Sequence, residues 1–161
     1  MLQVFHLRVA RSVLGLGVRD IGAYINISRS AVSKIERKDV TSILRVEEDQ
    51  NTILIKIFND KGVFFPDKNS VQYGADLKSY NTHLTRFQLR GGRAVLGLSQ
   101  REMSENLNIE KNVLNYLENL PNASMLYNTE KAQGDFNTTL KKFFDKNNIS
   151  FPTENSIKIN S

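Results

Sequence analysis

Apolar positions recur every three to four residues along most of the chain, which is the spacing of amphipathic helices. This pattern predicts two sets of three helices. The expected ranges are 2–14, 18–25 and 28–37, followed by 84–96, 100–107 and 110–119. Gly15 and Gly97 follow the first helix of each set, where glycine readily ends a helix.

The same order of residues occurs twice along the chain. Residues 5–8 (FHLR) recur 82 positions later, as FQLR from residue 87, and residues 11–16 recur at the same offset. Near the end the offset becomes 86, where Phe65-Pro66 matches Phe151-Pro152. Two homologous domains are therefore predicted, with four residues inserted in the second. Their expected bounds are 1–74 and 75–161, with a linker around residues 74–81.

One segment of each copy is ambiguous when taken alone. Residues 53–58 are rich in isoleucine and suit a strand, whereas the matching residues 139–144 suit an amphipathic helix. A shared fold requires the same structure in both, so a helix is predicted in each. Residues 63–73 and 149–159 then predict a short β-hairpin. The expected fold class is mainly α: two tandem domains, each closed by a helix and a hairpin.

The turn between the second and third helices of each copy has strict geometric requirements. Two short helices joined this tightly need a residue with positive φ in the turn, which suits Asn26 and Asn108. They also need a small residue where they cross, and Gly22 and Ser104 occupy that position. The spacing therefore predicts a helix-turn-helix in both copies.

Residues 5–38 resemble the lambda-repressor-like (XRE) family of helix-turn-helix transcriptional regulators. The resemblance depends on the run Leu14-Gly15-Leu16, on its spacing to the turn at Asn26, and on the closing Glu36. Residues 87–120 resemble the same family, with the run Leu96-Gly97-Leu98-Ser99-Gln100. The resemblance implies a repressor or other regulator of transcription, of bacterial or mobile-element origin, that is cytoplasmic and associated with the nucleoid.

The resemblance also implies which residues contact double-stranded DNA, with the helix at 28–37 lying in the major groove. Base edges would be read by Arg29, Ser30, Ser33 and Lys34. Backbone phosphates would be contacted by Arg19, Ser28, Arg37 and Lys38, and Ser28 also fits the helix N-cap. The family usually begins its second helix with a glutamine that contacts the DNA backbone. Val18 stands there, and Arg8 is the candidate to replace that contact.

The second copy presents a different surface. Its candidates for DNA contacts are Gln100, Arg101, Lys111, Asn112, Asn115 and Tyr116. Residues 82–120 carry five basic and four acidic side chains, however, so counterion release contributes little to DNA binding there. This domain therefore either contacts DNA or packs against a partner or its own twin. The homodimer usual in the family and an intramolecular pseudo-dimer both stay open.

Two pairs of opposite charge are expected to be structural. The family often pairs an arginine of the first helix with an acid of the third, and the corresponding pairs are Arg11 with Glu36 and Arg93 with Glu118. Neither of the two histidines has a second ligand at metal spacing, so no metal or other cofactor is expected. No combination of acid, base and nucleophile points to an enzyme.

Charge favours a polyanionic partner. The net charge is +5 with a pI of about 9.5, and residues 1–38 hold seven basic and two acidic residues. The chain has no cysteine, no apolar run that could span a membrane and no signal-peptide pattern at its start. A DNA-binding regulator is the leading hypothesis. The alternative is a protein-interaction module on the same fold, such as an antitoxin or accessory regulator.

Overall fold

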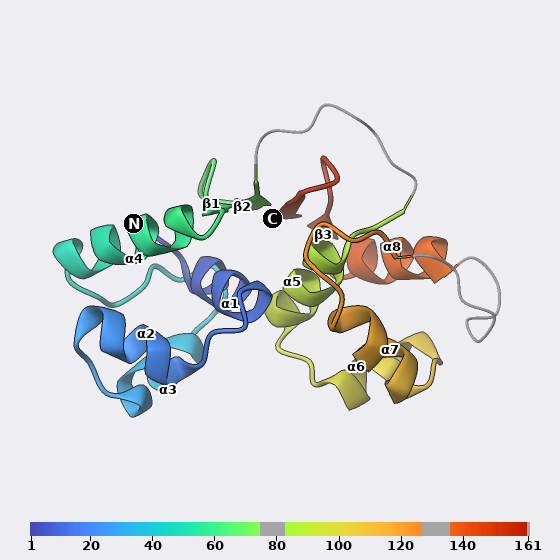
Figure 1. Cartoon of the computed structure of the whole chain (residues 1–161), viewed down its shortest axis with the longest axis horizontal. Helices are drawn as coiled ribbons and strands as arrows, with labels where there is room; N and C mark the ends of the chain where they lie inside the picture. The colour runs from blue at the N-terminus through green and yellow to red at the C-terminus, as the bar shows by residue number, and fades with distance from the viewer. Residues whose placement is uncertain (75–82, 127–135, 161) are drawn as a thin grey trace.

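The computed structural model describes residues 1–74, 83–126 and 136–160, which are mainly helical with a small antiparallel sheet (Figure 1). The first half contains α1 (Val4–Val13), α2 (Val18–Ile25), α3 (Arg29–Glu36), α4 (Glu48–Asp60), β1 (Val63–Phe64) and β2 (Ser70–Tyr73). The second half contains α5 (Arg86–Leu96), α6 (Gln100–Leu107), α7 (Lys111–Glu118), α8 (Phe136–Lys146), β3 (Ile149–Ser150) and β4 (Ser156–Ile159). The first three helices of each half lie within two residues of their predicted bounds. None of these helices is long and apolar enough to cross a membrane.

Local chemistry explains the turns between the short helices. Asn26 and Asn108 adopt positive φ angles of 57° and 54°, a conformation that asparagine tolerates better than most residues. Gly22 lies where α2 meets the chain after this turn. A Cβ atom there would lie 2.5 Å from the carbonyl oxygen of Ile27, so the close approach depends on glycine. Ser28 caps α3, because its hydroxyl accepts a hydrogen bond from the Ala31 N–H at 3.1 Å.

The chain that follows α3 returns to the start of α1 and supplies hydrogen-bond acceptors there. The N–H of Val4 donates to the carbonyl of Ser42 at 2.9 Å, and the second half repeats the contact from Arg86 to Ser124 at 2.9 Å. The first N–H groups of a helix have no acceptor within the helix itself. These contacts therefore satisfy donors that would otherwise need water.

Matched contacts in the two halves locate the four-residue insertion. Leu44 and Leu126 make the same backbone contact at an offset of 82, whereas Asn51 and Asn137 make the same side-chain contact at an offset of 86. The insertion therefore lies between these points, around residues 127–135, which are outside the described residues. The predicted linker, residues 74–81, is also outside them except for Gly74. The domain boundary between residues 74 and 75 stays a prediction.

The two hairpins join into one sheet with the strand order β1-β2-β4-β3. Strands β2 and β4 pair antiparallel, with Val71 directly opposite Ile157. Since these two residues are equivalent in the repeat, the pairing is symmetric about this point. Each hairpin was predicted to close its own domain. The structure also pairs β2 of the first hairpin with β4 of the second, so the prediction was incomplete.

The same approximate two-fold relation holds where α1 meets α5 at the centre of the molecule (Figure 1). Val9 of α1 lies against Gly91 of α5, its own repeat equivalent. A Cβ atom on Gly91 would overlap the side chain of Ile157 and lie 3.2 Å from Cγ1 of Val9. Glycine therefore allows the two helices and β4 to meet, and buried apolar side chains of both halves form one continuous core.

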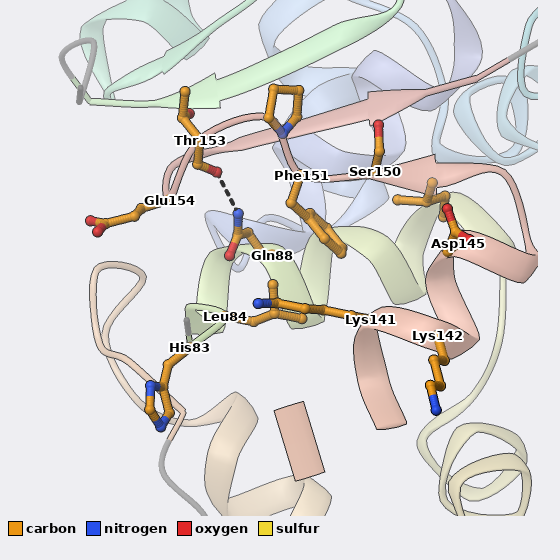
Figure 2. A pocket seen from close by; sticks show the side chains of 12 residues that line it. His83, Leu84, Gln88, Lys141, Lys142, Asp145, Ser150, Phe151, Thr153 and Glu154 are labelled. Carbon is orange, nitrogen blue, oxygen red and sulfur yellow. Dashed lines mark hydrogen bonds between the residues drawn. The ribbon is translucent and has the colours of Figure 1, made fainter. Parts of the chain in front are cut away.

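His6 and Gln88 occupy equivalent positions in α1 and α5, beneath their hairpins. The Gln88 side chain accepts a hydrogen bond from the Thr85 N–H at 3.0 Å and donates one to the carbonyl of Thr153 at 2.7 Å (Figure 2). In the first half, Nδ1 of His6 accepts the corresponding bond from the Gln3 N–H at 2.9 Å. Gln88 thus connects the start of α5 to its hairpin by hydrogen bonds, whereas His6 bonds to the start of α1 and packs edge-on against Phe65.

The environment of His6 disfavours its protonated form. The side chain is 2% exposed, and this burial lowers its pKa to about 4. The backbone carbonyls of Asp67 and Ser70 and the carboxylate of Asp67 oppose the shift only in part. Nε2 of His6 makes no well-formed hydrogen bond with the described residues. The histidine is therefore neutral at neutral pH.

We predict that the free energy of unfolding decreases as the pH falls from about 6.5 towards 4. In this range the unfolded chain binds a proton at His6 and the folded chain does not, so protonation favours unfolding by up to about 3 kcal/mol. His6→Gln introduces the side chain of the second half and should remove this contribution. Urea denaturation of both proteins between pH 4 and 7.5 is the measurement. Parallel stability curves would contradict the prediction.

Candidate nucleic-acid interface

Helix α3 and the residues at its two ends carry most of the first-half side chains predicted to contact DNA. The helix is anchored by Val32, which is fully buried on its inner face. Away from Val32, at the start of the helix and just beyond its end, exposed side chains belong to Arg29, Ser30, Lys34, Arg37 and Lys38. Ser33 is half-buried, and Arg19, at the start of α2, is exposed. Anchoring one face of the helix holds the polar side chains of the other face towards solvent.

The corresponding helix of the second half, α7, is also exposed on one side. It buries Val113, Leu114 and Leu117. Its exposed positions are occupied by Lys111, Asn112, Asn115 and Tyr116, and the tyrosine is 62% exposed. This face therefore carries a single positive charge and mostly neutral polar groups, in contrast to the basic face of α3.

At the start of α6, the two residues predicted to contact DNA differ in their availability. Arg101 is exposed. Gln100 is half-buried, and its side-chain amide lies 3.4 Å from a carboxylate oxygen of Glu118. Part of the hydrogen-bonding capacity of Gln100 is thus directed into the protein. Val18, at the matching position of the first half, has no such capacity.

In the view of Figure 1, the pair α2 and α3 and the pair α6 and α7 lie along the same edge of the molecule. The shared sheet lies towards the opposite edge, and α1 and α5 meet between the two pairs. In this view both helix pairs therefore lie on the same side of the packed helices α1 and α5, away from the sheet.

Bidentate ion pairs hold the third helix of each half against its first helix. Arg11 donates to the two carboxylate oxygens of Glu36 at 2.6 and 2.8 Å, and Arg93 donates to those of Glu118 at 2.7 and 2.5 Å. Both arginines also donate to a carbonyl of the following loop, that of Leu16 or Leu98. The second pair is the more deeply buried, because the Glu118 side chain is 1% exposed and the Glu36 side chain 12%.

Arg86 is a structural residue that the repeat did not reveal, because Val4 occupies the matching position of the first half. The Arg86 side chain is buried and donates to the carbonyls of Val13 and Glu118, at 2.9 Å each, and to the side chain of Asn122. It therefore joins the end of α1 to the end of α7 across the two halves. Burial lowers its pKa, and the nearby Arg90 adds to this effect.

A cavity of about 410 Å³ lies between α5, α8 and the β3–β4 hairpin (Figure 2). Basic side chains of Lys141 and Lys142 and acidic side chains of Asp145 and Glu154 surround it. Within the described ranges, no three histidine, cysteine, aspartate or glutamate residues are grouped to hold a metal ion. The mixed charge of this cavity contrasts with the uniform charge of the α3 face.

No family model matches the chain, and comparison with curated proteins and with solved structures finds no similar protein. The geometry and charge of the described residues are therefore the basis for inferring function.

We predict that Glu118→Gln destabilises the protein by about 3 kcal/mol, because it leaves the Arg93 guanidinium half-buried without its carboxylate. The matched variant Glu36→Gln should cost only about 1 kcal/mol, since Arg11 and Glu36 are more exposed to water. Urea denaturation monitored by circular dichroism measures both. Equal losses, or a larger loss for Glu36→Gln, would show that burial does not determine the contribution of these pairs.

Proposed function

We propose that the chain is a sequence-specific DNA-binding regulator of transcription. It consists of two tandem helix-turn-helix units of the lambda-repressor-like type, which form a pseudo-dimer within one chain. The placement of α3 and α7 carries this proposal, because two exposed helices related by an approximate two-fold axis lie along one edge of the molecule (Figure 1). Duplex DNA has two-fold symmetry of its own, so two such helices suit adjacent turns of the major groove.

The first half supplies the stronger contacts in this proposal. Arg29 and Lys34 are exposed on α3 and suit the N7 and O6 acceptors of guanine, while Ser30 and Ser33 adapt to either donors or acceptors. Near the helix ends, the positively charged side chains of Arg19, Arg37 and Lys38 are exposed and suit contacts with backbone phosphates. The Ser28 hydroxyl caps α3, so it contributes chiefly by fixing the start of the helix.

The second half reads a different and weaker half-site. Amide side chains, such as those of Asn112 and Asn115, suit the N6 and N7 atoms of adenine, and both are exposed. Lys111 and Arg101 provide the phosphate contacts, whereas Gln100 is partly engaged by Glu118. The preferred DNA site is therefore asymmetric, with a guanine-containing half under α3 and an adenine-containing half under α7.

A second candidate function is supported by the α7 face. Tyr116 is 62% exposed and lies among neutral amides rather than cations, and tyrosine is enriched at protein–protein interfaces. In this alternative the protein is an antitoxin or accessory regulator, and α7 contacts a partner protein. Replacement of Tyr116 by alanine distinguishes the two functions, because only the alternative predicts loss of a protein partner with DNA binding unchanged.

Reversing two charges on α3 tests the proposed reader. Arg29→Glu with Lys34→Glu should reduce affinity for a selected DNA site by about 100-fold or more, because two base contacts become repulsive. Lys61→Glu with Lys68→Glu is the matched control, since both lysines are exposed near the β1–β2 hairpin, away from α3 (Figure 1). Fluorescence anisotropy with a site enriched from random DNA is the measurement. Equal losses in the two variants, or no enriched site for the intact protein, would reject the proposal.

The pseudo-dimer predicts the stoichiometry of the complex. One chain of 18.3 kDa should bind one site, with protection of two half-sites centred about 34 Å apart. Analytical ultracentrifugation of protein with labelled DNA, together with footprinting, measures both quantities. Two chains on a single pair of half-sites would replace the pseudo-dimer by a homodimer and leave DNA binding itself intact.

A further inference from the structure

A cleft of about 600 Å³ lies where the two halves meet, beside α3. Equivalent residues of both halves line it, because Arg8 and Arg11 of α1 are matched by Arg90 and Arg93 of α5. Arg37, from the end of α3, adds a fifth guanidinium. We call this feature the arginine cleft.

The positive charge of the arginine cleft is only partly neutralised. Glu36 neutralises Arg11, and Glu118 neutralises Arg93, each through a bidentate pair. Among the residues that the structure describes, the other three arginines of the cleft, Arg8, Arg37 and Arg90, form no ion pair. Three guanidiniums are therefore available to an anion.

Two of these arginines cross from one half to the other. The guanidinium of Arg8 lies against Gly97, at the end of α5, and Nε of Arg90 donates to the hydroxyl of Ser12, in α1, at 3.2 Å. Both side chains are half-buried, and loss of solvent is the main cause that lowers their pKa. Partly desolvated cations gain more from an anion than fully hydrated cations do.

We propose that the arginine cleft binds a phosphate group, and that this group is a backbone phosphodiester of the DNA held by α3 and α7. This inference rests on the proposed function for its DNA source. Arginine suits the group because its planar fork donates two parallel hydrogen bonds to phosphate oxygens.

The position of the cleft favours DNA over a free anion. Ser33 and Arg37 line the cleft and also belong to the candidate DNA surface of α3, so the two surfaces are continuous. The cleft takes matched residues from both halves and therefore lies close to the approximate two-fold axis. When two helices occupy adjacent major-groove turns, the minor groove between them faces this axis, and the two backbones that border it pass close to either side. Arg8 here supplies the backbone contact for which Val18 has no polar group.

The test compares the salt dependence of DNA binding between intact protein and Arg8→Gln/Arg90→Gln. The logarithm of affinity should fall less steeply with the logarithm of salt concentration in the variant, by about 0.9 for each phosphate that the variant no longer neutralises. Lys61→Gln/Lys68→Gln removes the same charge elsewhere and should keep the slope of the intact protein. Arg8→Lys/Arg90→Lys keeps the charge without the fork, and it provides a folded variant if the glutamine variant unfolds. It should lose affinity while retaining most of the slope.

A second arm measures binding of inorganic phosphate and pyrophosphate by calorimetry without DNA, at constant ionic strength. A reduced slope in the glutamine variant, with no measurable binding of the free anions, supports the proposal in full. Unchanged slopes together with cleft-dependent pyrophosphate binding overturn the DNA source and establish a free-anion site. Unchanged slopes without anion binding overturn the proposal entirely.

The variant with Arg29→Glu and Lys34→Glu separates this proposal from the proposed function. If it keeps full affinity for the enriched site, the reading role of α3 is wrong. The anion arm still decides whether the cleft binds phosphate. If it loses the site while Arg8→Gln/Arg90→Gln keeps both affinity and slope, α3 reads DNA and the cleft does not contact it.

Discussion

The antiparallel pairing of β2 with β4, centred on Val71 and Ile157, determines how the two halves of the molecule are placed. Successive side chains of a strand point to opposite faces, so a shift of β4 by one residue along β2 would turn Ile157 out of the core. In the observed register Val71 and Ile157 are both fully buried. In that register Ile157 also reaches Gly91, where α5 lies against α1. The pair of strands β2 and β4 thus defines the approximate two-fold axis near which α1 and α5 also meet.

The bidentate ion pairs link the central helices α1 and α5 to the exposed helices α3 and α7. Arg11 and Arg93 stand on the two helices that meet at the axis, and their carboxylate partners stand at the ends of α3 and α7. A guanidinium paired through two parallel hydrogen bonds fixes both direction and distance. The orientation of the two exposed helices is therefore set by the same helices that form the centre of the core. Arg86 adds a third connection, which reaches across the halves.

The repeat made the helices predictable, because each ambiguous segment had a clearer twin, as residues 53–58 had in 139–144. The spacing of apolar residues predicted helix α3, and the family resemblance supplied its candidate DNA contacts. The repeat did not predict the shared sheet, since strands of two to four residues carry no information about their partner. Arg86 was missed because its twin is a valine. The arginine cleft was missed because Arg8 and Arg90 are distant in sequence and meet only through the packing of α1 on α5.

The packing of Val9 against Gly91 shows what linking the two halves in one chain permits. In a dimer of identical subunits, every substitution appears twice at the symmetry axis, so a large residue must accommodate its own copy. Here Val9 contributes a side chain at the contact and Gly91 contributes none. The covalent link between the halves also keeps the local concentration of each half around the other high at any dilution. Under the proposed function, occupancy of a DNA site would then rise in direct proportion to the concentration of the chain while most sites are empty. A subunit that first had to find its partner would instead show a steeper, threshold-like response.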